Sequence, residues 1–296
     1  MIPARFDYVR PPDLEGALRI LAERAGEAKV LAGGYSLVPV LKLRLAEPAL
    51  LVDLRDVGGL DGIVETDDDI RIGARATHRR ILEDPRIAER LPLFAEAAAG
   101  IGDPQVRNWG TIGGSVAHAD PSGDWPAVLL AARASIVCRR LGGERVVPAR
   151  DFFVDSFVTA LDPTEIVVEI RVPRPGPRSG GAYEKLERRA GDFATVGCAV
   201  QLELADDGRI ARSGIGLTAV APAPFAATEA EAILDGAGPS DELFRRAGQA
   251  AADRSSPASD AHGPADYKRA MVAELTARAL RRAVARARGE ATGGRR

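Results

Sequence analysis

Cysteine and histidine are scarce in this chain of 296 residues. It holds two cysteines, Cys138 and Cys198, whereas an iron–sulfur cluster needs about four thiolate ligands. Its three histidines, His78, His118 and His262, are scattered and match no HExxH pattern, so no zinc or other metal site is predicted. Redox chemistry in this chain therefore requires an organic cofactor.

Long apolar runs and an excess of one charge are missing as well. The longest apolar candidate, WPAVLLAA at 125–132, is far shorter than the roughly 18 residues expected of a membrane span. The N-terminus lacks the apolar core of a signal peptide, and 40 basic residues nearly balance 42 acidic ones. This balance argues against nucleic acid or an anionic membrane as a partner. We therefore expect a cytoplasmic globular protein with no membrane span.

Apolar periodicity predicts helices and strands in alternation over the first part of the chain. Asp13 is placed to cap a helix whose apolar residues recur at i, i+3, i+4 and i+7, and Ser36 and Thr77 are placed to cap later helices. Pro39 is tolerable because it falls in the first turn of its helix. The other expected elements are strands at 28–34, 49–57 and 69–74, helices at 91–102 and 125–134, a hairpin over 135–149 that turns at Gly142–Gly143, and a strand at 165–173.

The segment PRPGPRSGG at 173–181 is the strongest predicted boundary, because three prolines and three glycines interrupt any regular element. Beyond it the residues alternate as in antiparallel strands, with DDGR as a hairpin turn. Thr228 with Glu231 matches a capping box, Ser240 can cap a further helix, and a long helix is expected over 264–288. Strands and helices without strict βαβ order predict an α+β fold.

Two segments share an unusual composition: LAGGYSLVP at 31–39 and TIGGSVAHADPSGD at 111–124 each place a serine just behind a glycine pair. Backbone N–H groups in tight glycine turns can converge on a diphosphate, and hydroxyls of Ser36, Thr111 and Ser115 could add donors. Glycine pairs are also typical of ordinary turns, and Asp120 and Asp124 fit a turn and a helix cap. The pattern alone leaves both interpretations open.

The sequence lacks the motifs of other nucleotide-binding sites and of serine hydrolases. There is no GxxxxGK[ST] phosphate loop, no GxGxxG placed as in a dinucleotide-binding βαβ unit, and no GxSxG nucleophile turn. No residue is predicted to act as a general acid or base.

Longer motifs carry a resemblance to a known family. The segments AGGYSLVPVLKLRLAEP, DPQVRNWGTIGGSVAHADPSGDWPAVLLA, AYEKLERRAGDFATVGCAV and ASDAHGPADYKRAMVAELTARAL resemble the FAD-binding medium subunits of molybdenum hydroxylases, of the kind found in aerobic carbon monoxide dehydrogenases and xanthine dehydrogenases. The resemblance implies an FAD-binding region of two α+β subdomains, 1–57 and 58–177, of the vanillyl-alcohol oxidase-like type. A C-terminal domain with an antiparallel sheet and helices would span 178–290, and 291–296 would be a disordered tail.

The same resemblance implies where FAD binds. Asp124 would accept a hydrogen bond from a cofactor hydroxyl, Leu161 and Lys185 would line the site, and Asp192 and Phe193 would lie beside the isoalloxazine ring. Two diphosphate loops are implied, formed by Ala32, Gly33, Gly34, Tyr35 and Ser36 and by Thr111, Ile112, Gly113, Gly114 and Ser115. Tyr35 stands where the carbon monoxide enzymes usually have His, and Ser115 stands where they often have Asn. Phe193 replaces a Tyr.

The implied function is electron transfer within a larger complex. A large partner subunit would hold the molybdopterin cofactor and oxidise the substrate, and a small subunit with two [2Fe-2S] clusters would pass electrons to FAD on this chain. A quinone, nicotinamide or oxygen would be the acceptor, and a dimer of heterotrimers would be the assembly. The substrate, whether carbon monoxide, an aldehyde or an N-heterocycle, stays open.

Three alternatives remain. The chain could be a self-contained flavin oxidase or reductase, for which no acid–base constellation is visible. It could be a non-catalytic assembly protein of the same fold, which the intact glycine segments and Asp124 argue against. It could also be a regulator that binds free mononucleotides.

Overall fold

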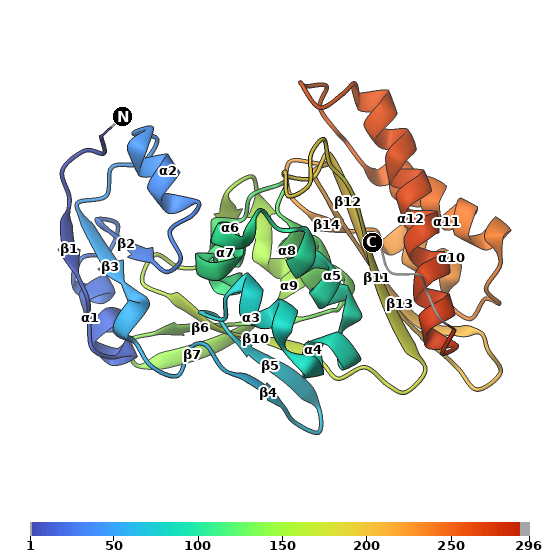
Figure 1. The fold of residues 1–296 in the computed structure, drawn as a ribbon, viewed down its shortest axis with the longest axis horizontal. Coiled ribbons are helices and arrows are strands. Elements are labelled where there is room, and N and C mark those ends of the chain that lie inside the picture. The colour runs from blue at the N-terminus through green and yellow to red at the C-terminus, as the bar shows by residue number, and fades with distance from the viewer. Residues whose placement is uncertain (1, 291–296) are drawn as a thin grey trace.

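The computed structural model describes residues 2–290, and the tail predicted at 291–296 lies outside the described residues. Three main sheets follow one another along the molecule, with the N-terminal unit at one end and the C-terminal unit at the other (Figure 1). Helices and antiparallel sheets dominate, which confirms the α+β class.

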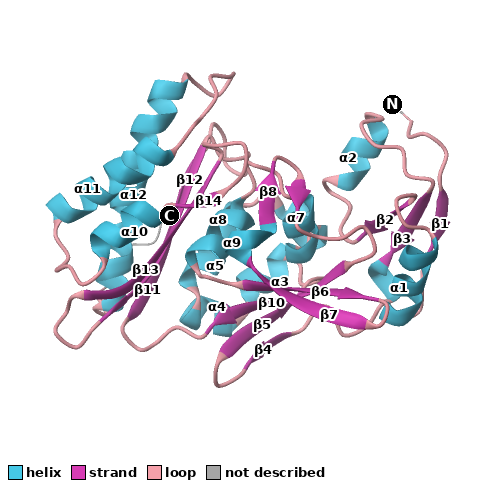
Figure 2. Cartoon of the chain, turned by 180° about the vertical axis from the view of Figure 1, so that it is seen from behind, coloured by secondary structure: helices cyan, strands magenta, loops and turns pink. Residues whose placement is uncertain are grey.

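The N-terminal unit is a small parallel sheet with one helix packed on it. The strand order is β1 (Asp7–Val9), β3 (Leu50–Asp53) and β2 (Ala28–Leu31). The predicted cap of α1 (Leu14–Glu23) is confirmed, because Asp13 accepts a hydrogen bond from the Gly16 amide at 2.7 Å. The apolar face of α1 packs on β3 and also reaches Val137, Ile166 and Val168 of the next sheet. Helix α2 (Leu37–Lys42) stands beside this unit (Figure 2).

The middle unit is a five-stranded antiparallel sheet of order β4-β5-β10-β6-β7, with helices packed on it. The predicted hairpin over 135–149 is confirmed, with Arg140 paired to Gly143, so the turn falls on Leu141 and Gly142, one residue earlier than expected. The elements are β4 (Ile63–Glu65), β5 (Asp69–Gly73), α3 (His78–Glu83), α4 (Pro85–Arg90), α5 (Pro92–Gly100), α6 (Pro104–Trp109), α7 (Ile112–His118), α8 (Asp124–Ala131), β6 (Ser135–Arg140), β7 (Gly143–Pro148), α9 (Ala149–Phe152), β8 (Phe153–Asp155), β9 (Val158–Thr159) and β10 (Ile166–Pro173).

The C-terminal unit is a four-stranded antiparallel sheet with helices on its outer face (Figure 1). The predicted Ser240 cap is confirmed, since its hydroxyl accepts from the Leu243 amide. Only residues 174–178 separate the last strand of the middle unit from the first strand here. The elements are β11 (Ser179–Leu186), β12 (Val196–Leu204), β13 (Ile210–Thr218), β14 (Phe225–Ala226), α10 (Thr228–Leu234), α11 (Asp241–Arg254) and α12 (Ala265–Ala287).

Two local predictions are wrong. Thr228 and Glu231 form no capping box, because α10 begins at Thr228 with Ala227 as its N-cap and without a side-chain cap. The buried Glu231 carboxylate instead pairs with Arg150 at 2.5 Å and with Arg133 at 3.1 Å, across the joint between the middle and C-terminal units. Ser36 stands at the N-cap of α2 but makes no capping hydrogen bond.

Helix α8 is the element that joins the middle and C-terminal units. All eight of its residues are buried. A Cβ added at Gly216 would lie 2.0 Å from the Ala127 carbonyl oxygen, and one added at Gly214 would lie 2.0 Å from that of Ala131. The backbones of α8 and β13 therefore touch directly, and only glycine fits on the strand.

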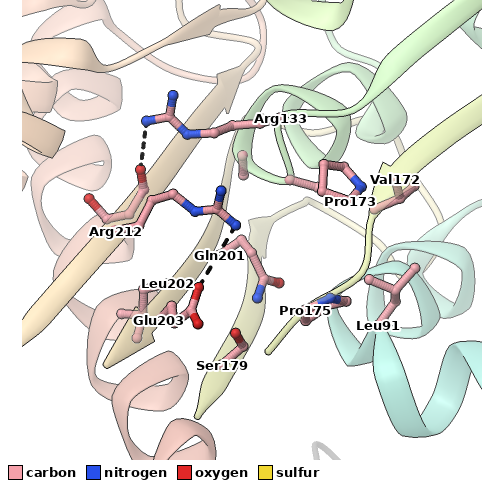
Figure 3. A pocket seen from close by; sticks show the side chains of 13 residues that line it. Leu91, Arg133, Val172, Pro173, Pro175, Ser179, Gln201, Leu202, Glu203 and Arg212 are labelled. Atoms are coloured by element: carbon pink, nitrogen blue, oxygen red, sulfur yellow. Dashed lines mark hydrogen bonds and ion pairs between the residues drawn. The ribbon is translucent and has the colours of Figure 1, made fainter. Parts of the chain in front are cut away.

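A small hollow lies at the same joint, lined by Arg133, Pro173, Gln201 and Arg212 among others (Figure 3). Its volume of about 30 Å³ suits about one water molecule and no cofactor. It shares no lining residue with the glycine segments.

The variant Gly216→Ala tests the contact between α8 and β13. The added methyl group must displace the backbone of α8, so we expect the free energy of unfolding to fall by about 3 kcal/mol. Gly238→Ala is the matched control, because a Cβ there meets nothing within 4 Å. Denaturant unfolding of both variants measures the effect, and equal stability of the two would contradict this packing.

Candidate functional site

The first glycine segment, Ala32–Ser36, connects β2 to α2 at the carboxyl end of the parallel sheet. Among the described residues, the amides of Gly33, Gly34, Tyr35 and Ser36 donate no hydrogen bond. Gly34 has φ of +86°, a conformation that favours glycine. The segment thus offers a row of backbone donors next to the start of a helix, which is the kind of donor set that holds a phosphate.

The second segment is not the loop that the sequence predicted. Thr111 caps α7, and its hydroxyl accepts from the Gly114 amide at 3.1 Å. The amides of Ile112 and Gly113 donate to Ala76 and Ala74, and that of Ser115 donates to Thr111. Thr111–Ser115 is therefore the cap and first turn of a helix whose amides are engaged within the protein. A ligand could approach its backbone closely at Gly114 and could contact the hydroxyl of the half-buried Ser115.

The two segments lie against each other although they are far apart in sequence. A Cβ at Gly33 would lie 2.2 Å from the carbonyl oxygen of Trp109, just before the second segment. A Cβ at Gly114 would lie 2.8 Å from the Thr111 hydroxyl oxygen and 3.9 Å from the Ala32 Cβ, so this glycine is within contact distance of the first segment. A groove of about 530 Å³ opens beside them, lined by Gly33, Gly34, Tyr35, Val38, Pro39, Lys42 and Leu43.

Asp124 and Lys185 form a buried ion pair. Asp124 is the first residue of α8 and Lys185 lies on β11, and the Lys185 Nζ is 3.1 Å from the Asp124 Oδ2. Nζ also donates to the Gly100 carbonyl oxygen at 3.0 Å. Burial raises the pKa of Asp124, and Lys185 and a hydrogen bond from Tyr183 oppose that rise. The structure thus brings these two predicted residues together.

The remaining predicted residues are more dispersed. Leu161 is half-buried against the middle core, and no hydrogen bond among the described residues joins it to Asp124 or Lys185. Asp192 pairs with Arg188 at 3.5 Å, and Phe193 is 54% exposed. Their loop approaches the Lys185 neighbourhood, because a Cβ at Gly191 would lie 2.5 Å from the Gly102 carbonyl oxygen.

His78 packs against the residue before the second segment, and no sequence motif predicted this contact. Its Nδ1 accepts from the indole N–H of buried Trp125 at 3.0 Å, and its backbone amide donates to Gly110. A Cβ at Gly110 would lie 2.7 Å from the His78 ring, which makes glycine necessary before Thr111. Burial lowers the pKa of His78 to about 4, so the ring is neutral at neutral pH.

Comparison with known proteins identifies the family of this chain. Residues 4–175 match the family described as the FAD binding domain in molybdopterin dehydrogenase, and residues 181–283 match the CO dehydrogenase flavoprotein C-terminal domain. The chain belongs to the FAD-binding medium subunits of molybdenum hydroxylases. It is therefore an FAD-binding, electron-transferring subunit of an oxidoreductase complex.

Relatives of this medium subunit cover nearly the whole chain. The carbon monoxide dehydrogenase medium chain of Hydrogenophaga pseudoflava is 42% identical, covering 97% of this chain and 99% of the relative. The nicotine 6-hydroxylase medium subunit of Paenarthrobacter nicotinovorans is 38% identical, covering 94% and 97%. The solved structure of quinoline 2-oxidoreductase from Pseudomonas putida 86 superposes with a TM-score of 0.90 at 32% identity, covering 97% and 99%.

Tyr183 and Glu187 also surround the ion pair, and sequence analysis did not single them out. The signal was present in YEKLE, because Tyr183, Lys185 and Glu187 recur at the two-residue period of an extended strand and so share one face.

The pH dependence of stability tests the neutral state of His78. The unfolded chain protonates this ring near its ordinary pKa of 6.5, whereas the folded protein resists protonation down to about 4. The neutral His78 ring therefore contributes fully to the free energy of unfolding above pH 6.5. As the pH falls to 4 this contribution, about 3 kcal/mol, is lost.

Denaturant unfolding across that pH interval provides the measurement, with His78→Asn as the reference. Asparagine keeps an acceptor for Trp125 but does not titrate, so the wild type should lose stability more steeply than the variant. Parallel curves for the two proteins would show that folding does not lower the pKa of His78, which would contradict this prediction.

Proposed function

We propose that this chain holds FAD between its two glycine segments and the Asp124–Lys185 pair, takes electrons from an iron–sulfur partner subunit, and passes them to an external acceptor. One observation carries the proposal of the site. Four amides of the first segment donate no hydrogen bond among the described residues, and they lie beside a second segment whose Gly114 presents no side chain toward Ala32. Backbone donors converging on a narrow gap suit a diphosphate.

The residues present fit FAD. The amides of Gly33–Ser36 would hold the diphosphate, with Ser115 adding a hydroxyl and Asp124 accepting from a cofactor hydroxyl. The other residues that would complete the site are Ala32, Thr111, Ile112, Gly113, Gly114, Leu161, Lys185, Asp192 and Phe193. When bound, FAD supplies the redox chemistry. The protein binds and orients it, and no side chain is required to move a proton.

The partners and the cellular setting are part of the proposal. We expect a large molybdopterin-binding subunit and a small subunit with two [2Fe-2S] clusters, assembled as a dimer of heterotrimers. Relatives are named for carbon monoxide and nicotine, so the substrate would be selected by a partner and not by this chain. None of the helices within residues 2–290 is long and apolar enough to cross a membrane. We place the complex in the cytoplasm.

Expression of the chain alone tests FAD binding directly. We expect a yellow protein that releases FAD in acid at about one molecule per chain. Gly114→Val places a branched side chain against the Thr111 hydroxyl and within reach of Ala32, where it would narrow the space beside the first segment, so we expect FAD affinity to fall about tenfold. Gly58→Val is the control, because a Cβ at Gly58 meets nothing within 4 Å.

A colourless wild type that takes up no FAD even with its partner subunits would overturn the proposed site and favour an assembly protein. Unchanged affinity in Gly114→Val would show that the diphosphate lies elsewhere. Reduction of the isolated FAD-loaded chain by carbon monoxide, nicotine or quinoline would instead favour a self-contained flavoenzyme.

A further inference from the structure

A cluster of four ionisable side chains, three of them buried, lies where the middle and C-terminal units meet. Asp124 comes from α8, and Tyr183, Lys185 and Glu187 come from one face of β11 and the residue after it. Tyr183, Lys185 and Asp124 are each less than 9% exposed. A buried charge is costly unless partners compensate it, so every contact in this cluster affects the others.

Tyr183 holds one side of the Asp124 carboxylate. Its hydroxyl donates to the Asp124 Oδ1 at 2.5 Å, while Lys185 contacts the other oxygen, Oδ2. Burial raises the pKa of Tyr183 well above its usual value, so the phenol keeps the proton that it donates. The carboxylate is therefore held from two sides and cannot rotate freely.

Glu187 lies against the Lys185 ammonium group as Tyr183 lies against the Asp124 carboxylate. The Glu187 Oε2 lies 3.4 Å from the Lys185 Nζ, and it is buried without a hydrogen-bond partner among the described residues. Nζ is thus surrounded by oxygens of Gly100, Asp124 and Glu187. A long lysine side chain has several rotamers, and two hydrogen-bond acceptors together with a neighbouring carboxylate favour one of them.

We propose that Tyr183 and Glu187 are positioning residues of the FAD site: Tyr183 orients Asp124, and Glu187 orients Lys185. This inference rests on the proposed function, in which Asp124 and Lys185 contact the cofactor. The two positioning residues would set the direction and charge of those contacts, and hence the affinity for FAD and the electronic environment of the flavin.

The joint between the middle and C-terminal units has contacts that do not involve the Tyr183 hydroxyl. Strand β11 is also held by Glu96 of α5, which accepts from the Tyr183 backbone amide at 2.9 Å and pairs with Arg282 and Arg286 of α12. These contacts involve no phenol oxygen. Removing that oxygen should therefore change the site while leaving the joint between the units intact.

The first experiment compares Tyr183→Phe with Tyr267→Phe. Tyr267 is an exposed tyrosine of α12 whose hydroxyl has no hydrogen-bond partner among the described residues. We expect Tyr183→Phe to raise the dissociation constant for FAD about tenfold, which corresponds to about 1.4 kcal/mol, and to shift the visible absorption bands of bound flavin. Tyr267→Phe should match the wild type in both.

A second variant, Glu187→Gln, keeps the shape of the side chain and removes its charge. We expect about threefold weaker FAD binding and a shifted flavin spectrum, because this residue is partly exposed and its ion pair is longer. This variant tests the proposal even if Tyr183→Phe does not fold. Unfolding of each apoprotein separates a loss of stability from a loss of positioning.

The outcomes distinguish the two proposals. A wild type that binds no FAD overturns the proposed function and this inference with it. A wild type that binds FAD, with affinity and spectrum unchanged in both Tyr183→Phe and Glu187→Gln, overturns only the inference. Weaker binding with shifted bands in folded variants supports the positioning role.

Discussion

Helix α8 and strand β13 touch through their backbones, and the placement of Asp124 relative to Lys185 depends on that contact. Gly214 and Gly216 leave no side chain between strand and helix, so the distance between them has little freedom. Asp124 begins the helix on one side of the joint, while Lys185 belongs to the sheet on the other. Two elements packed at this distance can hold a buried ion pair at 3.1 Å.

The candidate site is assembled from three units that contribute different groups. The N-terminal unit supplies unpaired backbone amides, the middle unit supplies a helix start with a glycine facing them, and the C-terminal unit supplies a lysine. None of these groups forms a binding site alone. Their chemistry is that of binding and orientation, which matches a subunit whose cofactor carries out the electron transfer.

Much of this was predictable from sequence because it is local. Asp13, Thr77 and Ser240 cap helices as their positions predict, and the hairpins follow from alternating residues and turn chemistry. The family resemblance, carried by several joined motifs, correctly indicated an FAD-binding medium subunit.

The local rules failed where tertiary contacts competed with them. Glu231 has the spacing of a capping residue, but two arginines far away in sequence offer its carboxylate stronger partners. Residues 111–115 look like a glycine loop, yet Ala74 and Ala76 accept their first amides and the chain continues as a helix. The support of Asp124 by Tyr183 required knowledge of which strand faces α8, and periodicity alone does not supply that.

The contact between Gly33 and Trp109 has a consequence for assembly of the whole chain. It places the two halves of the proposed diphosphate site on two units that also meet where the apolar residues of α1 and β3 share a core with Val137, Ile166 and Val168. A ligand that bridges two such units adds its binding free energy to their association. The cofactor would then act as a non-covalent cross-link, so that a loaded chain presents its partner subunits with a stiffer surface than an empty one.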